Sequence, residues 1–157
     1  MKKLLPKIVL FLFILLIYFL PSFIFKTDTE YYNSLNGVKL PVIVFPIVWT
    51  LIYICMSIYI VLLINFVNSN NVNKKELRLL VFFLILNYLI SSSFTYVFFT
   101  VHNLFASYII KLATFLTILL VSLETLLINK KLTLLTIPYV IWSIIASVFA
   151  ILIYLQN

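Results

Sequence analysis

The chain alternates between long apolar runs and short polar segments. A helix that crosses the hydrocarbon core of a bilayer needs roughly 20 apolar residues. Five runs reach that length, and they cover residues 4–25, 40–67, 79–100, 104–128 and 132–155. They lack the strict alternation of apolar and polar residues typical of membrane β-strands, and an open sheet would leave unpaired backbone groups in lipid. The pattern therefore predicts an all-α polytopic membrane protein, in which residues 1–157 form a single bundle of five transmembrane helices.

The composition points to the same class. Of 157 residues, 65% are hydrophobic and 10% are charged, whereas soluble domains carry roughly 45–50% apolar and about 25% charged residues. A water-soluble globule is excluded, and a single Cys excludes a disulfide-stapled secreted scaffold. Five spans joined by short loops use the whole length, so the sequence predicts no separate soluble domain.

The first apolar run has an alternative interpretation, because two lysines followed by apolar residues also begin a secretory signal. The run is longer than the apolar core of such a signal, and no pair of small residues marks a cleavage site before Lys26. We therefore expect residues 4–25 to remain as the first transmembrane helix.

The basic residues predict the orientation of the bundle. With five spans, eight of them fall on one side of the membrane, and two, Lys26 and Lys39, fall on the other in the polar segment 26–39. The eight are Lys2, Lys3, Lys7, Lys74, Lys75, Arg78, Lys130 and Lys131. The positive-inside rule then places the N-terminus in the cytoplasm and the C-terminus outside. We expect the lipid bilayer, and not nucleic acid, to be the partner of these charges, because they form no surface stripe interleaved with aromatic residues.

Side chains suited to catalysis are scarce. The chain has one His, one Cys and four acidic residues, too few for a metal cluster or for the usual nucleophile and base pairs. We predict no catalytic and no metal-binding residues. Cys55 is expected to be a small buried apolar residue, and His102 a polar residue of a tight interfacial turn.

Aromatic and polar residues recur at helical spacing inside three of the runs. The second run has Phe45, Trp49 and Tyr53 at intervals of four residues, the third has Asn87 and Ser91, and the fifth is centred on Trp142. Trp49 is deep for an interfacial tryptophan, so helix packing and the lining of a ligand cavity are both open interpretations. For Asn87 and Ser91, the simplest role is interhelical hydrogen bonding.

Two charged residues lie within the fourth run. Glu124 is near the basic end of the run, so we expect it to reach the interface. Lys111 lies about eight residues from the outer turn, roughly 12 Å along a helix. It either extends to the membrane surface or faces the anionic group of a ligand.

Three segments resemble the TspO/MBR family, the tryptophan-rich sensory or translocator proteins. Residues 44–58, VFPIVWTLIYICMSI, resemble the family's second-helix signature, and residues 138–142, PYVIW, resemble its fifth-helix pattern. Residues 98–104, FFTVHNL, are similar to the stretch that links helices three and four. The matches occur in order at compatible spacing. Only two tryptophans of the usual larger set are present, and either Asn87 or Ser91 matches the family's third-helix asparagine.

The resemblance implies a five-helix bundle whose pocket opens toward the loop between helices one and two and binds tetrapyrroles such as haem or protoporphyrin, or sterol-like ligands. The ligand-binding residues then expected are Trp49, Tyr53, Trp142, Asn87, Tyr32, Phe45, Ser91 and Lys111. The rings would stack on the flat pigment, and Lys111 would meet a carboxylate. No obligatory cofactor is expected. The family also implies a homodimer, for which Ser143, Ala146, Ser147 and Ala150 offer a small-residue face.

The interpretation that we favour is a tetrapyrrole-binding protein of the cytoplasmic membrane that transports or senses its ligand. The sequence is rich in Lys, Asn, Ile and Phe, a composition typical of an AT-rich bacterial genome. Two alternatives are a light-dependent enzyme that degrades porphyrins through Trp49 and Trp142, and a membrane assembly subunit without a small ligand. An ion-coupled transporter is disfavoured because buried acidic residues for a proton relay are few.

Overall fold

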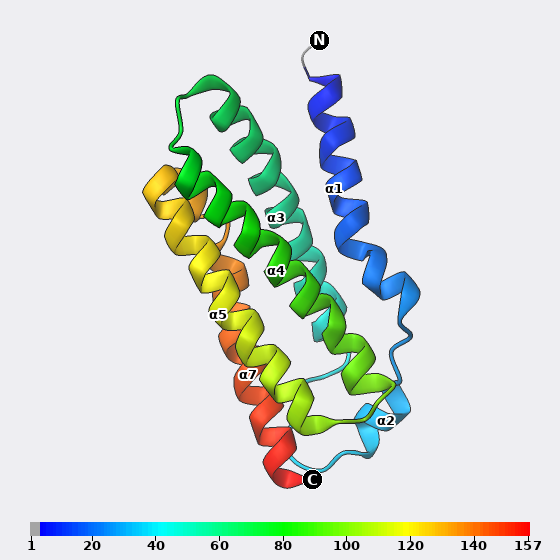
Figure 1. Cartoon of the computed structure of the whole chain (residues 1–157). Helices are drawn as coiled ribbons and strands as arrows, with labels where there is room; N and C mark the ends of the chain where they lie inside the picture. Colours follow the sequence, from blue (N-terminus) through cyan, green and yellow to red (C-terminus); the bar gives the residue numbers. More distant parts are fainter. Residues whose placement is uncertain (1–3) are drawn as a thin grey trace.

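Five long helices cross the length of the molecule, and two short ones connect them (Figure 1). The computed structural model describes residues 4–157, so Lys2 and Lys3 lie outside the described residues. The long helices are α1 (Leu5–Ile24), α3 (Val44–Ser69), α4 (Lys74–Phe99), α5 (Leu104–Ile128) and α7 (Ile137–Gln156), and the short ones are α2 (Thr29–Ser34) and α6 (Lys130–Thr133). Helix makes up 82% of the structure, and the described part of the chain has no strands. The predicted all-α class with five membrane-spanning helices is confirmed.

The ends of several helices are set by amide or carboxylate side chains that accept hydrogen bonds from free backbone N–H groups. Asn73 caps α4 by accepting from the Lys75 N–H, and Asn103 caps α5 in the same way. These caps explain why α4 begins at Lys74, five residues before the apolar run that predicted it. Asn129 caps the short helix α6, and a turn at residues 134–136 separates α6 from α7.

The segment between the first two spans, residues 26–39, was expected to be a polar loop, and it contains the additional helix α2. Asp28 caps this helix by accepting a hydrogen bond from the Tyr31 N–H at 2.9 Å. Gly37, with φ of 94°, adopts a backbone conformation that favours glycine at a bend after α2. The second span then begins at Val44, four residues later than the pattern predicts.

The bundle has a tightly packed part and a looser part. Helix α5 packs most extensively, against α4 on one side and α7 on the other. Its buried Ile118 and Val121 belong to one core together with Met56 and Tyr59 of α3 and Leu80 of α4. Helix α1 packs mainly on α3, and Ile14 and Pro21 are its buried residues. The helices that form the walls of the cavity described below therefore differ in how extensively they pack on their neighbours.

The outward faces of the long helices are apolar. Leu16, Ile85 and Leu116 are at least half exposed in the isolated chain, which is what a surface in contact with acyl chains requires. The start of α1 and the connection between α3 and α4 lie at one end of the bundle, and α2 and the C-terminus lie at the other (Figure 1). An odd number of spans gives this arrangement.

Candidate functional site

The main cavity lies inside the bundle at the α2 end and has a volume of about 410 Å³. Ligand pockets for small molecules usually measure roughly 300–1,000 Å³ and are mainly apolar. Helices α1, α3, α4, α5 and α7 and the segment around α2 all contribute to its wall. Its aromatic lining consists of Phe19, Tyr32, Phe45, Trp49, Tyr53, Phe94, Phe98, Phe99, Trp142 and Phe149. The segment between the first two spans closes one end, through residues that include Thr29, Tyr32 and Leu40.

Helix α3 supplies one aromatic wall of the main cavity. Phe45, Trp49 and Tyr53 are spaced four residues apart, so their side chains lie on one face of the helix. The rings of Trp49 and Tyr53 are 5.6 Å apart, and the ring of Phe45 meets Trp142 of α7 edge-on at 6.2 Å. The two tryptophans therefore border the same cavity from different helices, and neither faces only lipid.

Lys111 enters the main cavity from α5. The residue is 5% exposed, and its Nζ lies 3.5 Å from the ring centroid of Phe94 and 5.0 Å from that of Trp49. Cation–π contacts of this kind stabilise an ammonium group only partly. The interpretation in which Lys111 extends to the membrane surface is wrong, because its side chain is held between two cavity rings. Within residues 4–157, this ammonium has no carboxylate partner and no hydrogen bond.

Two further polar groups of the cavity wall differ in whether they have a hydrogen-bond partner. The hydroxyl of Tyr32 donates to the Leu40 carbonyl at 2.9 Å, which ties α2 to the segment that leads into α3. Burial raises the pKa of Tyr32 by more than this hydrogen bond lowers it, so the phenol stays neutral. The indole Nε1 of Trp142 is buried and has no hydrogen-bond partner among the described residues. This N–H and the ammonium of Lys111 both lack an acceptor, and both residues line the main cavity.

The two polar candidates on α4 separate in the structure. Ser91 lines the main cavity, whereas Asn87 does not. Asn87 is 3% exposed, and its Nδ2 donates to the Thr114 carbonyl at 3.0 Å and to the Thr117 Oγ1 at 2.9 Å. Asn87 therefore joins α4 to α5, which is the interhelical hydrogen bonding expected for it. Of the eight residues predicted to bind ligand, it alone is absent from the cavity wall.

The small-residue face of α7 packs inside its own chain. Ser143 and Ser147 are buried, at 2% and 8% exposure, and Ala146 and Ala150 line the main cavity. The two serines are therefore enclosed within the bundle, whereas Ala146 and Ala150 are half-buried, and the homodimer stays a prediction. Small side chains at Ala146 and Ala150 leave space for the cavity on this side of α7.

The surroundings of three other residues can be compared with those expected from the sequence. His102 is exposed in the turn between α4 and α5, as expected, and its ring stacks on Tyr31 at 3.8 Å. Cys55 is half-buried in α3. Glu124 was expected to reach the interface. It is half-buried instead, and its Oε2 is buried with no hydrogen-bond partner among the described residues.

Sequence reasoning missed the contributions of α1 and of Tyr139. Phe19 and Ser22 of α1 line the main cavity. Tyr139 is 3% exposed, and its ring meets Trp49 edge-on at 5.6 Å. Helix α1 is apolar almost all round, so its periodicity does not indicate an inner face. The spacing of Tyr139, three residues before Trp142, is the signal that could have placed it inside the bundle.

The fold and the cavity define a class: a polytopic helical membrane protein with an aromatic-lined cavity between its spans. The sequence pattern of the TspO/MBR family matches residues 8–155, nearly the whole chain. The protein belongs to the TspO/MBR family, as the resemblance of its helix signatures predicted. A search of curated proteins found no matching sequence.

Proposed function

We propose that this membrane protein binds a tetrapyrrole, haem or a porphyrin, in the main cavity. The observation that carries the proposal is an aromatic cavity of about 410 Å³ that contains the amine of a buried lysine with no anionic partner among residues 4–157. A porphyrin is a flat apolar ring system with two carboxylates. Such a ligand presents faces that stack on aromatic side chains and an anion that pairs with a buried cation.

The proposed contacts follow from the wall of the cavity. Trp49 and Tyr53 of α3 and Trp142 of α7 offer ring surfaces, and Lys111 offers a cation close to the ring of Trp49. A carboxylate near Lys111 would remove the cost of a buried, unpaired charge. The free N–H of Trp142 adds a second donor for a ligand oxygen. Lipid alone supplies no acceptor for either group deep in the bundle, which is why we favour an acidic pigment over a purely hydrocarbon ligand.

Titration of the purified protein with haem and protoporphyrin tests binding. We expect saturable quenching of tryptophan fluorescence, because both tryptophans border the cavity. Trp49→Phe should weaken binding, since it removes part of the stacking surface. Phe13→Leu is the matched control, because Phe13 is a 60% exposed aromatic residue on the lipid-facing side of α1. Quenching that never saturates, or equal affinity in native protein and both variants, would contradict the proposal and favour an assembly subunit without a small ligand.

A second candidate function is light-dependent degradation of the bound porphyrin. It is favoured by one observation: Trp49 and Trp142, the two indoles of the chain, lie in the wall of the same cavity. Illumination of the saturated complex in the presence of oxygen separates the two functions. A pigment spectrum that does not change while binding persists excludes degradation, and bleaching that disappears in Trp49→Phe and Trp142→Phe supports it.

We also propose that the N-terminus lies in the cytoplasm of a bacterial cell. The described basic residues support this orientation, because Lys7, Lys74, Lys75, Arg78, Lys130 and Lys131 belong to the end of the bundle opposite α2. A cysteine introduced at position 131 should then react with membrane-impermeant reagents only after the cells are opened. Transport is distinguished from sensing by measuring porphyrin movement into proteoliposomes.

A further inference from the structure

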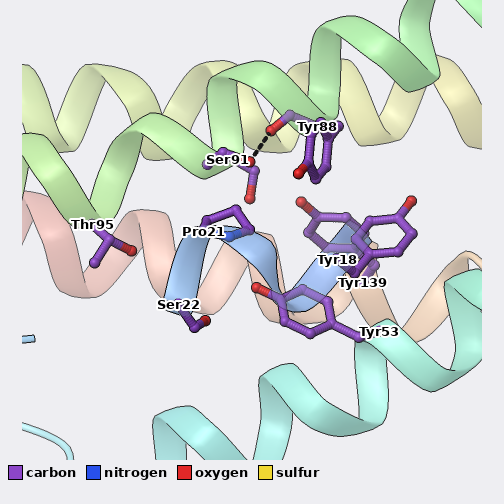
Figure 2. Close-up of a pocket in the computed structure, with 9 residues that line it drawn as sticks. Tyr18, Pro21, Ser22, Tyr53, Tyr88, Ser91, Thr95 and Tyr139 are labelled. Atoms are coloured by element: carbon purple, nitrogen blue, oxygen red, sulfur yellow. Dashed lines mark hydrogen bonds between the residues drawn. The ribbon is translucent and has the colours of Figure 1, made fainter. Parts of the chain in front are cut away.

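A second, smaller space lies beside the main cavity, between α1, α3, α4 and α7 (Figure 2). We call it the hydroxyl chamber and define it by six of its lining residues, Tyr18, Tyr53, Tyr88, Ser91, Ser92 and Tyr139. Each of them carries a hydroxyl group. The volume of the chamber is about 30 Å³, which is enough for one or two water molecules at roughly 10–15 Å³ each. A concentration of hydroxyl groups in the membrane-spanning part of a protein needs a physical reason, because polar groups are costly there.

Some of these hydroxyls are satisfied within the chain. Tyr88 donates to the Ile17 carbonyl of α1 at 2.9 Å, and Ser92 donates to the Tyr88 carbonyl at 2.6 Å. The dashed line in Figure 2 marks the second of these bonds. Both donors are therefore occupied, and the Tyr88 bond joins α4 to α1 beside the chamber.

Other hydroxyls retain unused capacity. Within residues 4–157, the Tyr53 phenol, which lines the chamber, has no hydrogen-bond partner. Ser91 and Tyr139 also line the chamber. An unpaired hydroxyl in an apolar medium costs roughly 1–3 kcal/mol on the basis of protein mutational data. Water or a polar group of a ligand would therefore be bound favourably in this chamber.

The chamber and the main cavity adjoin. Ser22, Tyr53, Ser91 and Thr95 line both of them. Three of these four are serine or threonine and the fourth is tyrosine, so the boundary between the two spaces is made of hydroxyl-bearing side chains. A ligand that fills the main cavity therefore meets hydrogen-bonding groups at this boundary, while the rest of its surroundings is mostly aromatic.

We propose that the hydroxyl chamber is a hydrated subsite of the main cavity that takes an alcohol or carbonyl oxygen on the edge of the bound ligand, either directly or through a bridging water. The proposal rests on the proposed function in one respect, that the main cavity binds a porphyrin-like ligand. It adds a chemical preference: between two pigments with the same ring and the same carboxylates, the one with oxygen-bearing edge substituents binds more tightly.

A matched pair of porphyrins tests this preference. Haematoporphyrin carries two hydroxyethyl groups where mesoporphyrin carries two ethyl groups, and their carboxylates are the same. The measured quantity is the ratio of the two dissociation constants, mesoporphyrin over haematoporphyrin, for each protein. We expect this ratio to fall by about tenfold in Ser91→Ala and in Tyr53→Phe, as the loss of one or two hydrogen bonds predicts.

Ser93→Ala is the matched control, because Ser93 donates to the Ile90 carbonyl of its own helix at 2.7 Å and lines neither space. Its ratio should equal that of the native protein. If both porphyrins bind and the ratio is unchanged in Ser91→Ala and Tyr53→Phe, the subsite is refuted and the proposed function stands. If neither porphyrin binds the native protein saturably, the proposed function fails and the subsite fails with it. Thermal unfolding of each variant checks that Tyr53→Phe and Ser91→Ala leave the fold intact.

Discussion

Replacement of Lys111 by methionine should have opposite effects on stability and on ligand binding. The side chain is 5% exposed, and its charge is offset by two aromatic rings and no anion within the described chain. Removing it abolishes the desolvation penalty of a buried charge and two cation–π contacts, each worth roughly 0.5–2 kcal/mol. Methionine has a similar length and fills the same space. Since replacing buried charges by apolar residues often stabilises proteins by about 1–4 kcal/mol, we expect Lys111→Met to unfold at a higher temperature than the native protein.

The same substitution should weaken the binding of porphyrins with free carboxylates. A hydrogen bond to a charged group contributes roughly 1.5–3 kcal/mol, which corresponds to about a 10- to 150-fold increase in the dissociation constant. Protoporphyrin dimethyl ester is the matched ligand, because it keeps the ring and lacks the negative charge. The affinity for the ester should be nearly the same in the native protein and in Lys111→Met.

Two measurements on the same preparations decide the matter: thermal unfolding in detergent without ligand, and fluorescence titration with the free acid and the ester. A lower unfolding temperature together with an unchanged dissociation constant for the free acid would refute the reasoning. Lys111 would then be a structural group whose cation–π contacts outweigh its desolvation.

Three further predictions concern the framework around the cavity. Asn87→Ala removes two hydrogen bonds from α4 to α5 and should destabilise the protein by about 1–3 kcal/mol in unfolding experiments, at roughly 0.6–1.7 kcal/mol for each bond; an unchanged stability would contradict this role. Tyr59→Phe breaks the 2.7 Å hydrogen bond to Thr125, and in a double-mutant cycle with Thr125→Val the coupling should be about 0.6–1.7 kcal/mol, whereas additive effects would exclude the bond. Gly37→Ala should loosen the α2 segment and speed its proteolysis, because the φ of 94° is unfavourable for alanine and the new Cβ would overlap the Gln156 side chain; a cleavage rate equal to that of the native protein would disprove this.

The sequence predicted the membrane-spanning architecture well, because the length of an apolar run is nearly sufficient to specify a transmembrane helix. The short helices α2 and α6 escaped prediction, since each depends on a local cap, by Asp28 and by Asn129 respectively. The start of α4 was placed too late for a related reason. Its first turn, beginning at Lys74, is charged and lies before the apolar run, so hydropathy does not reveal it.

The candidate site was only partly accessible from the sequence. Four-residue spacing was enough to group Phe45, Trp49 and Tyr53 on one face, and the structure brings that face to the cavity. The direction of Lys111 could not be decided, because its depth along a helix fits both a surface and a cavity position. The contribution of Ser22 was also hidden, since an apolar helix in lipid has no polar outer face that would mark its inner one.

The uneven packing of the helices gives the cavity one stiff side and one compliant side. Helices α4, α5 and α7 are held together by close packing and by the bonds of Asn87, whereas α1 is attached mainly to α3 and contributes Phe19 and Ser22 to the wall. Pigments of different thickness would then be accommodated by a shift of α1, at little expense to the rest of the fold. If the cavity binds a tetrapyrrole as proposed, the position of α1 would adjust to the ligand, and ligands of more than one shape would be accepted.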